Sequence, residues 1–390
     1  MTLEEARLTT PAILALEDGS VFRGVAIGAP GTTVGEMVFN TAMTGYQEIA
    51  TNPAHVRQLV ALTCPHIGNV GTNADDDESA ATAAGLIVRS GAMVASSFRS
   101  QEPLGDWLVR RGIVAIAELD TRRLTRLLRE GGRQYGCIAT GPELDEQAAV
   151  ARARARAGET EVEAIAAVST VQPYDWTEGS WDLKRGFFRP DPAQQPWHVV
   201  VYDFGCTRSS LRRLVDLGCR LTVVPARTTA ESVLAMNPDG VFLSSGPDGA
   251  RHCSDGVAAV GELLEAGMPL LGLGVGLQLL ALASGAELAR LDSGHHGDNY
   301  PVRDLERGTV AMTRQFNDSV VADEGLPEAL QITHRSGFDD SIQGLRHRRC
   351  PALGIQGLPS PGEASGGAPS PLEQFVELMK SRSNPSSGER

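Results

Sequence analysis

The second half of the chain alternates short apolar runs with helical segments, and this alternation restricts the folds it can adopt. Helical patterns such as SSLRRLVDLG and DGVAAVGELLEAG separate the runs, which are HVVVYDFG, RLTVVPA, DGVFLSSG and MPLLGLG. Because consecutive positions are apolar, both faces of each strand must be buried, which predicts a parallel sheet covered by helices on both sides. Ligands of such sheets bind at the carboxyl ends of the strands, here Gly205, Gly246 and the turn 272–277.

The first half has a different pattern. Short strands are expected at AILALEDGSVFRGVAIG, a hairpin turning at Asp18-Gly19, and at GEMVFNTAMTG, RQLVALTCP and GLIVRS. A helix is expected from Asp120-Thr121 to Gly131-Gly132, and the acidic run 75–78 as a solvated helix start. We therefore predict four parts: an α+β domain over 1–150, a Pro-, Gly- and Trp-rich linker over 151–196, an α/β domain over 197–380 and a disordered tail over 381–390.

Composition excludes several classes of function. The 390 residues carry a net charge of −13 without a basic stripe, which argues against nucleic-acid binding. No apolar run approaches the roughly 20 residues of a membrane span, and the acidic N-terminus does not resemble a secretory signal, so a cytoplasmic protein is expected. The six cysteines show no CxxC spacing, so we expect reduced thiols, with neither a metal site nor a cofactor.

The segment PLLGLGVGLQLLALASG predicts a strand, a tight turn and a helix. Such an elbow commonly presents a nucleophile, yet the turn from Gly272 to Leu277 holds no side chain that can attack, transfer a proton or bind metal. A dinucleotide fingerprint is the alternative, since Gly272 and Gly274 match G-x-G and Asp292 follows 20 residues after Gly272. Its third glycine would stand at Leu277, which argues against it.

Several motifs together resemble one family. They are EDGSVFRGVAIG, GEMVFNTAMTGYQEIATNP, LTCPHIGNVGTN, ELDTRRLTRLLREGG, VVVYDFG, MNPDGVFLSSGP, LLALASGAE and GHHGDNYPV, which span about residues 12 to 380. They are similar to the small, glutamine-hydrolysing subunit of carbamoyl-phosphate synthetase. The resemblance implies a class I amidotransferase domain that hydrolyses glutamine through Cys, His and Glu. It also implies a large subunit that receives the ammonia and uses ATP and bicarbonate.

The catalytic positions of the family are changed in this chain. The elbow G-x-C-x-G-H-Q aligns with 272–278, which puts Gly274 where the nucleophile stands. The segment G-H-P-E aligns with 357–360, which puts Leu358 at the base and Ser360 at the orienting acid. Since a triad acts as a unit, losing its nucleophile costs about 10⁶ in kcat.

The glutamine pocket implied by the resemblance is changed as well. The Gly-Pro-Gly-Asp loop reads Gly246, Pro247, Asp248 and Gly249, and the segment Q-N-H-G-F reads GlnPheAsnAspSer over 315–319. Ala42 replaces the serine that reaches glutamine from the N-terminal domain. Gly246 and Gln278 match the family and are the expected remnants of the substrate site.

Other reactive residues are poor substitutes for the triad, and a structural role is favoured for Cys253. Cys253 lies near the pocket loops, but GARHCSDG gives it no elbow, and the adjacent His252 has no evident orienting acid. His295 and His296 are neighbours that point in different directions, which favours hydrogen-bonded structural roles over metal binding. His334 is expected to order a turn.

The sequence therefore predicts a non-catalytic homologue that binds or modulates a large subunit in carbamoyl phosphate synthesis for arginine and pyrimidines. Two alternatives remain open. One is an active glutaminase and ligase subunit with displaced catalytic residues. The other is a stand-alone protein that binds another small molecule in the altered pocket.

Overall fold

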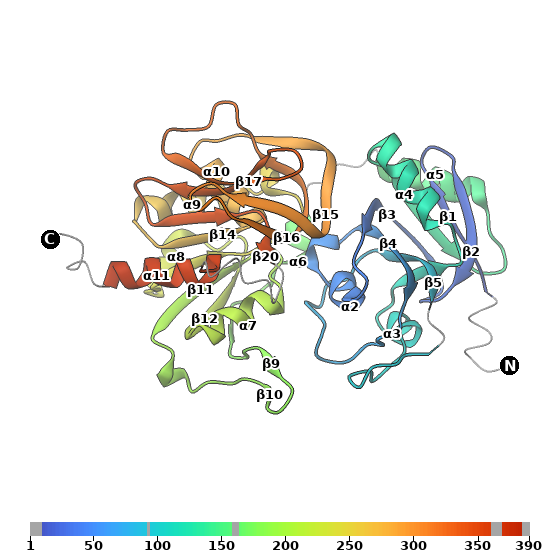
Figure 1. Ribbon diagram of the computed structural model, residues 1–390, viewed down its shortest axis with the longest axis horizontal. Helices are drawn as coiled ribbons and strands as arrows, with labels where there is room; N and C mark the ends of the chain where they lie inside the picture. Colours follow the sequence, from blue (N-terminus) through green and yellow to red (C-terminus); the bar gives the residue numbers. More distant parts are fainter. Residues whose placement is uncertain (1–9, 92–93, 158–163, 360–368, 384–390) are drawn as a thin grey trace. The chain divides into compact units, whose positions relative to one another are not determined.

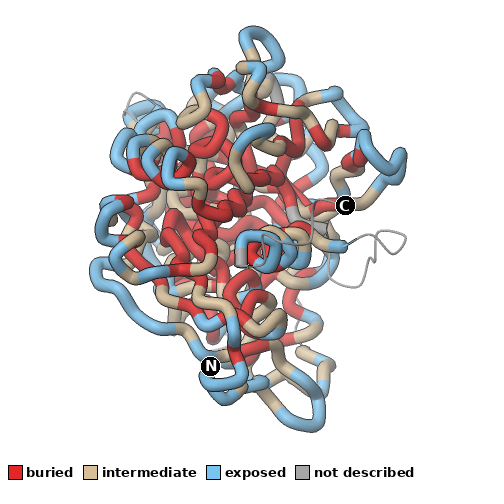
Figure 2. The backbone as a smooth tube through the Cα atoms, turned by 90° about the vertical axis from the view of Figure 1, so that its left-hand side faces the viewer, coloured by how far each residue is buried: buried red, intermediate tan, exposed pale blue. Residues whose placement is uncertain are grey.

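The computed structural model describes residues 10–91, 94–157, 164–359 and 369–383 (Figure 1). The chain divides into two compact units, 1–161 and 162–390. Figure 2 shows buried backbone segments flanked by exposed loops.

Unit 1 is built on a closed barrel with the strand order β1-β2-β6-β5-β4-β3-β7. The strands are β1 (Pro11–Leu16), β2 (Val21–Ala26), β3 (Thr32–Asn40), β4 (Gln58–Ile67), β5 (Gly85–Gly91), β6 (Val114–Ala117) and β7 (Tyr135–Thr140). β1 and β2 form the expected hairpin, in which Ala15 is paired with Val21. The barrel encloses a core that includes Leu14, Leu59 and Ile116.

Helices cover the barrel of unit 1. They are α2 (Tyr46–Ala50), α3 (Leu104–Arg110), α4 (Thr121–Gly131) and α5 (Glu146–Ala157), with a 3-10 turn at Pro53–His55. The predicted α4 is confirmed: the Asp120 carboxylate accepts the Arg123 N–H and caps the first turn. The helix ends before Gly132, whose φ of 73° suits glycine.

The prediction for the acidic run 75–78 is wrong, because no helix begins there. The run lies in a loop whose carboxylates find local partners instead of a helix dipole. Asp77 accepts a hydrogen bond from Gln47, Asp76 accepts one from Asn73, and Arg99 lies 3.0 Å from Asp76. These side-chain bonds compete with helix formation.

Unit 2 contains an 11-stranded sheet with the order β20-β16-β15-β17-β18-β19-β14-β13-β11-β12-β8. Its parallel centre consists of β11 (Trp197–Asp203), β12 (Cys219–Pro225), β13 (Gly240–Leu243), β14 (Leu270–Leu273) and β19 (Ala352–Ile355). The antiparallel strands are β8 (Tyr174–Trp176), β15 (Leu288–Asp304), β16 (Val310–Val321), β17 (Leu330–Ser336), β18 (Ile342–His347) and β20 (Leu358–Pro359). The parallel centre confirms the fold expected from the apolar runs.

Helices pack on both faces of the parallel centre (Figure 1). One face is covered by α7 (Arg208–Asp216) and α11 (Pro371–Ser383), and the other by α8 (Ala230–Ala235), α9 (Ser254–Glu265) and α10 (Val275–Ala283). Along β11, Val199 and Val201 enter the core under α7 and α11, whereas Val200 and Tyr202 enter the opposite core. This alternation explains why the run is apolar at consecutive positions.

The segment around the predicted linker contains regular structure. α5 continues across residue 150 to Ala157, with Ala149 and Ala153 buried against the barrel. α6 (Ala164–Val168), β8 and the small hairpin of β9 (Trp181–Asp182) and β10 (Gly186–Phe187) follow, and β8 extends the sheet beside β12. Of the predicted tail, 381–383 belong to α11 and 384–390 lie outside the described residues.

Two further observations concern the chain as a whole. Within the described residues, no helix is long and apolar enough to cross a membrane. All six cysteines lie in the described part of the chain and are free thiols.

Candidate functional site

The carboxyl ends of the parallel strands bring three loops of unit 2 together. β14 ends at Leu273 beside the end of β19, and the Gly274 N–H donates to the Ile355 carbonyl at 2.9 Å. A Cβ atom built on Gly274 would lie 3.4 Å from the Ser245 Cβ, in the loop after β13. The predicted elbow therefore lies between the loops that follow β13 and β19.

Gly274 has the backbone conformation of a strained strand-to-helix elbow. Its φ is 53° and its ψ is −111°, and it is the N-cap of α10. The nearest atoms to a built Cβ are the Ser245 Cβ at 3.4 Å and the Gln356 carbonyl oxygen at 3.7 Å, which are ordinary contact distances. A side chain would therefore be strained at this position but would have space.

The two neighbouring elbow glycines have no such space. A Cβ on Gly272 would lie 2.5 Å from the Gly276 carbonyl carbon, and one on Gly276 would lie 2.2 Å from the Leu243 carbonyl oxygen. Both clashes are with backbone, so side chains cannot move to relieve them. Glycine at 272 and 276 keeps the turn packed against β13, while glycine at 274 leaves it without a reactive group.

Gly246, one of the two predicted binding remnants, also needs to be glycine. A Cβ there would lie 1.9 Å from the Phe204 carbonyl oxygen, so the backbones of the loops after β11 and β13 are in direct contact at this point. The turn after β11 is fixed by Asp203, whose carboxylate accepts the N–H groups of Thr170, Gly205 and Cys206. Burial raises the pKa of this carboxyl group.

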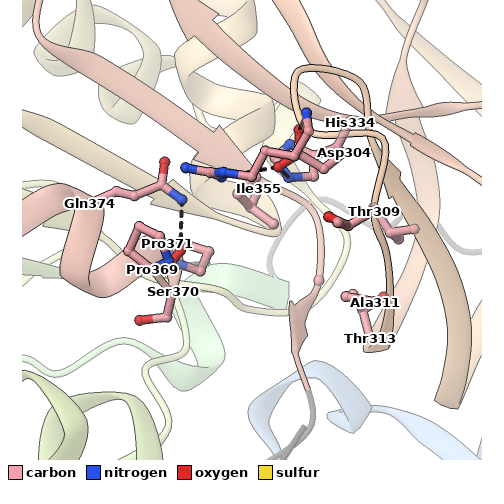
Figure 3. Close-up of a pocket in the computed structure, with 13 residues that line it drawn as sticks. Asp304, Thr309, Ala311, Thr313, His334, Ile355, Pro369, Ser370, Pro371 and Gln374 are labelled. Carbon is pink, nitrogen blue, oxygen red and sulfur yellow. Dashed lines mark hydrogen bonds and ion pairs between the residues drawn. The ribbon is translucent and has the colours of Figure 1, made fainter. Parts of the chain in front are cut away.

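The segment that the sequence comparison aligns with the family's base and acid, 357–360, follows β19. Leu358 lies in β20, where its backbone pairs with Arg314 of β16, and Ser360 lies outside the described residues. Gly357 lines a cavity of about 50 Å³ between the ends of β15, β16 and β17 and the start of α11 (Figure 3). Its polar lining comes from Asp304, Arg307, Thr309, Thr313, His334, Ser370 and Gln374.

His334 is the one histidine among the residues that line this cavity, and it differs from its prediction. It lies in β17 and not in a turn. Its Nε2 lies 3.8 Å from Asp304 Oδ2, and its Nδ1 lies 2.9 Å from Thr333 Oγ1. Burial lowers the pKa of the imidazole, and Asp304 opposes that shift. Arg307 already pairs with Asp304 at 3.0 Å, so the carboxylate is shared.

The cavity and the approach of His334 to Asp304 were not found from the sequence. Strands β15 and β17 bring Asp304 and His334 together from positions 30 residues apart, and no local motif marks either residue. A pattern read along the chain cannot register this pairing.

The other predicted remnant, Gln278, is 1% exposed in α10. Its Nε2 donates to the Ser319 carbonyl oxygen at 2.8 Å, which joins α10 to β16. Asn317 donates to the same oxygen at 3.1 Å, and the Ser319 hydroxyl donates to Asp248 at 2.8 Å. The residues that replace the family's pocket segments therefore bond to one another.

Cys253 does not have the surroundings of an activated thiol. It is the N-cap of α9 with φ −103° and ψ 60°, which is not an elbow. Burial raises the pKa of its thiol, so the reactive thiolate is disfavoured. Ala42 lies after β3 in unit 1, where its N–H donates to Asn40.

His295 and His296 have hydrogen-bonded roles in β15, as predicted. His295 lies 2.8 Å from Gln315 Oε1 and 3.0 Å from Asp339 Oδ2, and His296 lies 3.0 Å from Asp318 Oδ1. Each ring faces a different carboxylate. Within the described residues, no group of three or more His, Cys, Asp or Glu side chains could hold a metal ion.

The sheet, the elbow and the loops at its carboxyl edge define a class I glutamine amidotransferase domain. The family described as Glutamine amidotransferase class-I matches residues 200–362. The family described as Carbamoyl-phosphate synthase small chain, CPSase domain, matches residues 14–138.

The similarity to known proteins extends over nearly the whole chain. A carbamoyl phosphate synthase small chain of Thioalkalivibrio sulfidiphilus is 52% identical over 372 residues, which cover 95% of this chain and 98% of that one. Small chains of Vibrio parahaemolyticus and Salmonella typhimurium are 50% and 49% identical, each over 95% of this chain and over 99% and 97% of their own. The chain belongs to the carbamoyl phosphate synthase small chain family.

Proposed function

We propose that this protein is a non-catalytic small subunit. It binds a carbamoyl-phosphate synthetase large subunit and supports synthesis from free ammonia, or it modulates an intact small subunit of the same family. The product, carbamoyl phosphate, would serve arginine and pyrimidine synthesis. The protein would act as one half of a heterodimer, without a cofactor of its own.

The observation that carries this proposal is the geometry of Gly274. The elbow backbone has the φ of 53° that presents a nucleophile, and the residue there has no side chain. Glutamine hydrolysis by this fold requires a thiolate at the elbow, because an elbow places its nucleophile beside the N–H groups at the helix N-terminus that stabilise the oxyanion. An uncatalysed background rate is therefore expected.

Neither Cys253 nor His334 has the surroundings that the missing chemistry requires. Cys253 has a thiol whose pKa burial raises, and its backbone is not an elbow. His334 and Asp304 form a base-and-acid pair, but the cysteine-free lining of their cavity offers no thiol. The proposal of a displaced active site has no geometric support from these groups.

The extent of the family likeness supports a retained partner. Identity of 52% extends over 95% of the chain, including unit 1, which carries none of the triad positions. Such a likeness is expected when surfaces and core are still needed.

Co-purification tests the proposal. The full chain and the large subunit from the same genome are expressed together, with a tag on the large subunit only. We expect the two to elute as one complex at micromolar concentration, and this complex to make carbamoyl phosphate from ammonium chloride but not from glutamine. Absence of association would reject the proposal, and glutamine-dependent synthesis would restore the alternative of a displaced active site.

A further inference from the structure

Two side chains at the expected glutamine pocket of unit 2 have buried acceptor oxygens without donors. Within the described chain, Gln278 Oε1 and Asn317 Oδ1 are buried oxygens that have no hydrogen-bond partner. Gln278 is 1% exposed and Asn317 is 5% exposed. A buried amide oxygen without a donor costs about 1–3 kcal/mol, so two of them in one place call for an explanation.

The orientation of both amides follows from one neighbour. Gln278 Nε2 lies 2.8 Å and Asn317 Nδ2 lies 3.1 Å from the Ser319 carbonyl oxygen. Exchanging either amide's oxygen and nitrogen would place two carbonyl oxygens in contact, which is repulsive. The two amide nitrogens therefore face Ser319, and the two amide oxygens are the atoms that lack a hydrogen-bond donor.

A carboxylate belongs to the same group. Asp248 Oδ2 accepts the Ser319 hydroxyl hydrogen at 2.8 Å, so Asp248, Gln278 and Asn317 all bond to a single residue. Asp248 forms no ion pair within the described residues, although it also accepts the Gly249 N–H and is influenced by the charges of Arg290 and Asp318. Asp318 is itself held by His296 at 3.0 Å. The group thus combines one negative charge with two neutral acceptor oxygens, and its only hydroxyl donor is already used.

We propose that Asp248, Gln278 and Asn317 bind a small monovalent cation, either ammonium or an alkali ion. Such an ion supplies positive charge to the carboxylate and satisfies the amide oxygens, by N–H donation from ammonium or by direct coordination of an alkali ion. One carboxylate with two neutral oxygens matches a single positive charge, whereas Mg²⁺ and Ca²⁺ sites use more carboxylates or an octahedral water shell. Burial raises the pKa of Asp248, and a bound cation would oppose this shift.

The test uses the full chain alone, without the large subunit or glutamine, so its result is independent of the proposed function. Ammonium, potassium, sodium and magnesium chlorides are titrated at constant ionic strength, with choline chloride as the balancing salt. Binding is followed by calorimetry and by the thermal unfolding temperature. We expect a saturable rise in Tm with ammonium or potassium and none with choline or magnesium, and competition between the ions identifies the preferred one.

Variants locate the site. Asp248→Asn and Gln278→Met should each weaken cation binding at least tenfold. Asp248→Asn removes the negative charge, and Gln278→Met removes the amide oxygen while keeping a side chain of similar length. Asp255→Asn, at an exposed carboxylate on α9, makes the same charge change and should leave the response intact. Each variant is first shown to be folded in choline. A response that is absent, that choline reproduces, or that survives in Asp248→Asn would overturn the proposal.

Discussion

A cysteine nucleophile in this fold requires both a thiol and an elbow backbone. The starts of α9 and α10 in unit 2 each have one of these two features. At the start of α10, Gly274 has the elbow backbone, with φ 53° and ψ −111°, but no thiol. At the start of α9, Cys253 has the thiol, but its φ of −103° and ψ of 60° do not form an elbow. The comparison teaches that catalysis in this fold depends on thiol and geometry at the same residue, and neither start has both.

The largest expected effect is on the elbow's packing. Gly276→Ala should lower the free energy of unfolding by about 3 kcal/mol, because its Cβ would lie 2.2 Å from the Leu243 carbonyl oxygen. Urea and thermal unfolding measure the change. Gly261→Ala in α9 is the control: nothing lies within 4 Å of its Cβ, and it should stabilise the helix by about 0.5–1 kcal/mol. Equal effects would show that the elbow is not tightly packed.

The second prediction concerns a variant that places a thiol at the elbow residue, Gly274. Gly274→Cys should fold, at a cost of about 1–2 kcal/mol for a left-handed φ in a residue with a Cβ. Its thiol should react with iodoacetamide at pH 7 faster than that of Cys253. Both residues are helix N-caps, but burial raises the pKa of the Cys253 thiol. Labelling followed by peptide mass analysis compares the two sites. Slower labelling at 274 would contradict the assignment of the elbow.

Some of the features behind these predictions could be predicted from the sequence, and others could not. The apolar runs of β11 to β14 were readable because a doubly covered strand must be apolar at consecutive positions. The elbow at Gly274, without a reactive side chain, could be predicted from the sequence because an elbow is a local motif. The closed barrel of unit 1 was not, since closure depends on the pairing of β1 with β7 across more than 100 residues.

The acidic run 75–78 shows a different limit. Its charges suited a helix start, but Gln47 and Arg99, which lie near it only in the folded chain, hold it as a loop together with the neighbouring Asn73. The acceptor group at Asp248, Gln278 and Asn317 was likewise hidden, because α10, β16 and the loop after β13 come together only in the fold. Long-range contacts decided each of these features.

A third prediction concerns His334, the histidine of the cavity beside Leu358. Burial holds its pKa below the ordinary value of about 6.5, so the unfolded chain binds this proton more readily than the fold does. Stability should therefore be intact above about pH 6.5 and should fall as the pH drops from there toward the folded pKa. His334→Gln should make Tm less dependent on pH between 7 and 5.

The control for this measurement is His66→Gln, at an exposed histidine in β4. It should leave the pH dependence of Tm unchanged. A pH dependence that His334→Gln does not alter would show that the ring is not buried in its neutral form, and would weaken the description of the cavity.

The smallest effect is expected for a substitution at Cys253, at the start of α9. Cys253→Ala should change the free energy of unfolding by about 1 kcal/mol or less, since it removes one partly buried sulfur atom. It should leave the thermal response to cations and the association with a large subunit unchanged. A loss of association would show that the loop before α9 has a role that its packing does not reveal.

The most direct test of the account is glutamate release from glutamine by the purified chain, with and without the large subunit. We predict the background rate in both cases, the same rate in Cys253→Ala, and no γ-glutamyl thioester by mass analysis of the intact chain. Release well above background, abolished by Cys253→Ala or accompanied by a thioester, would contradict the claim that this elbow carries no chemistry.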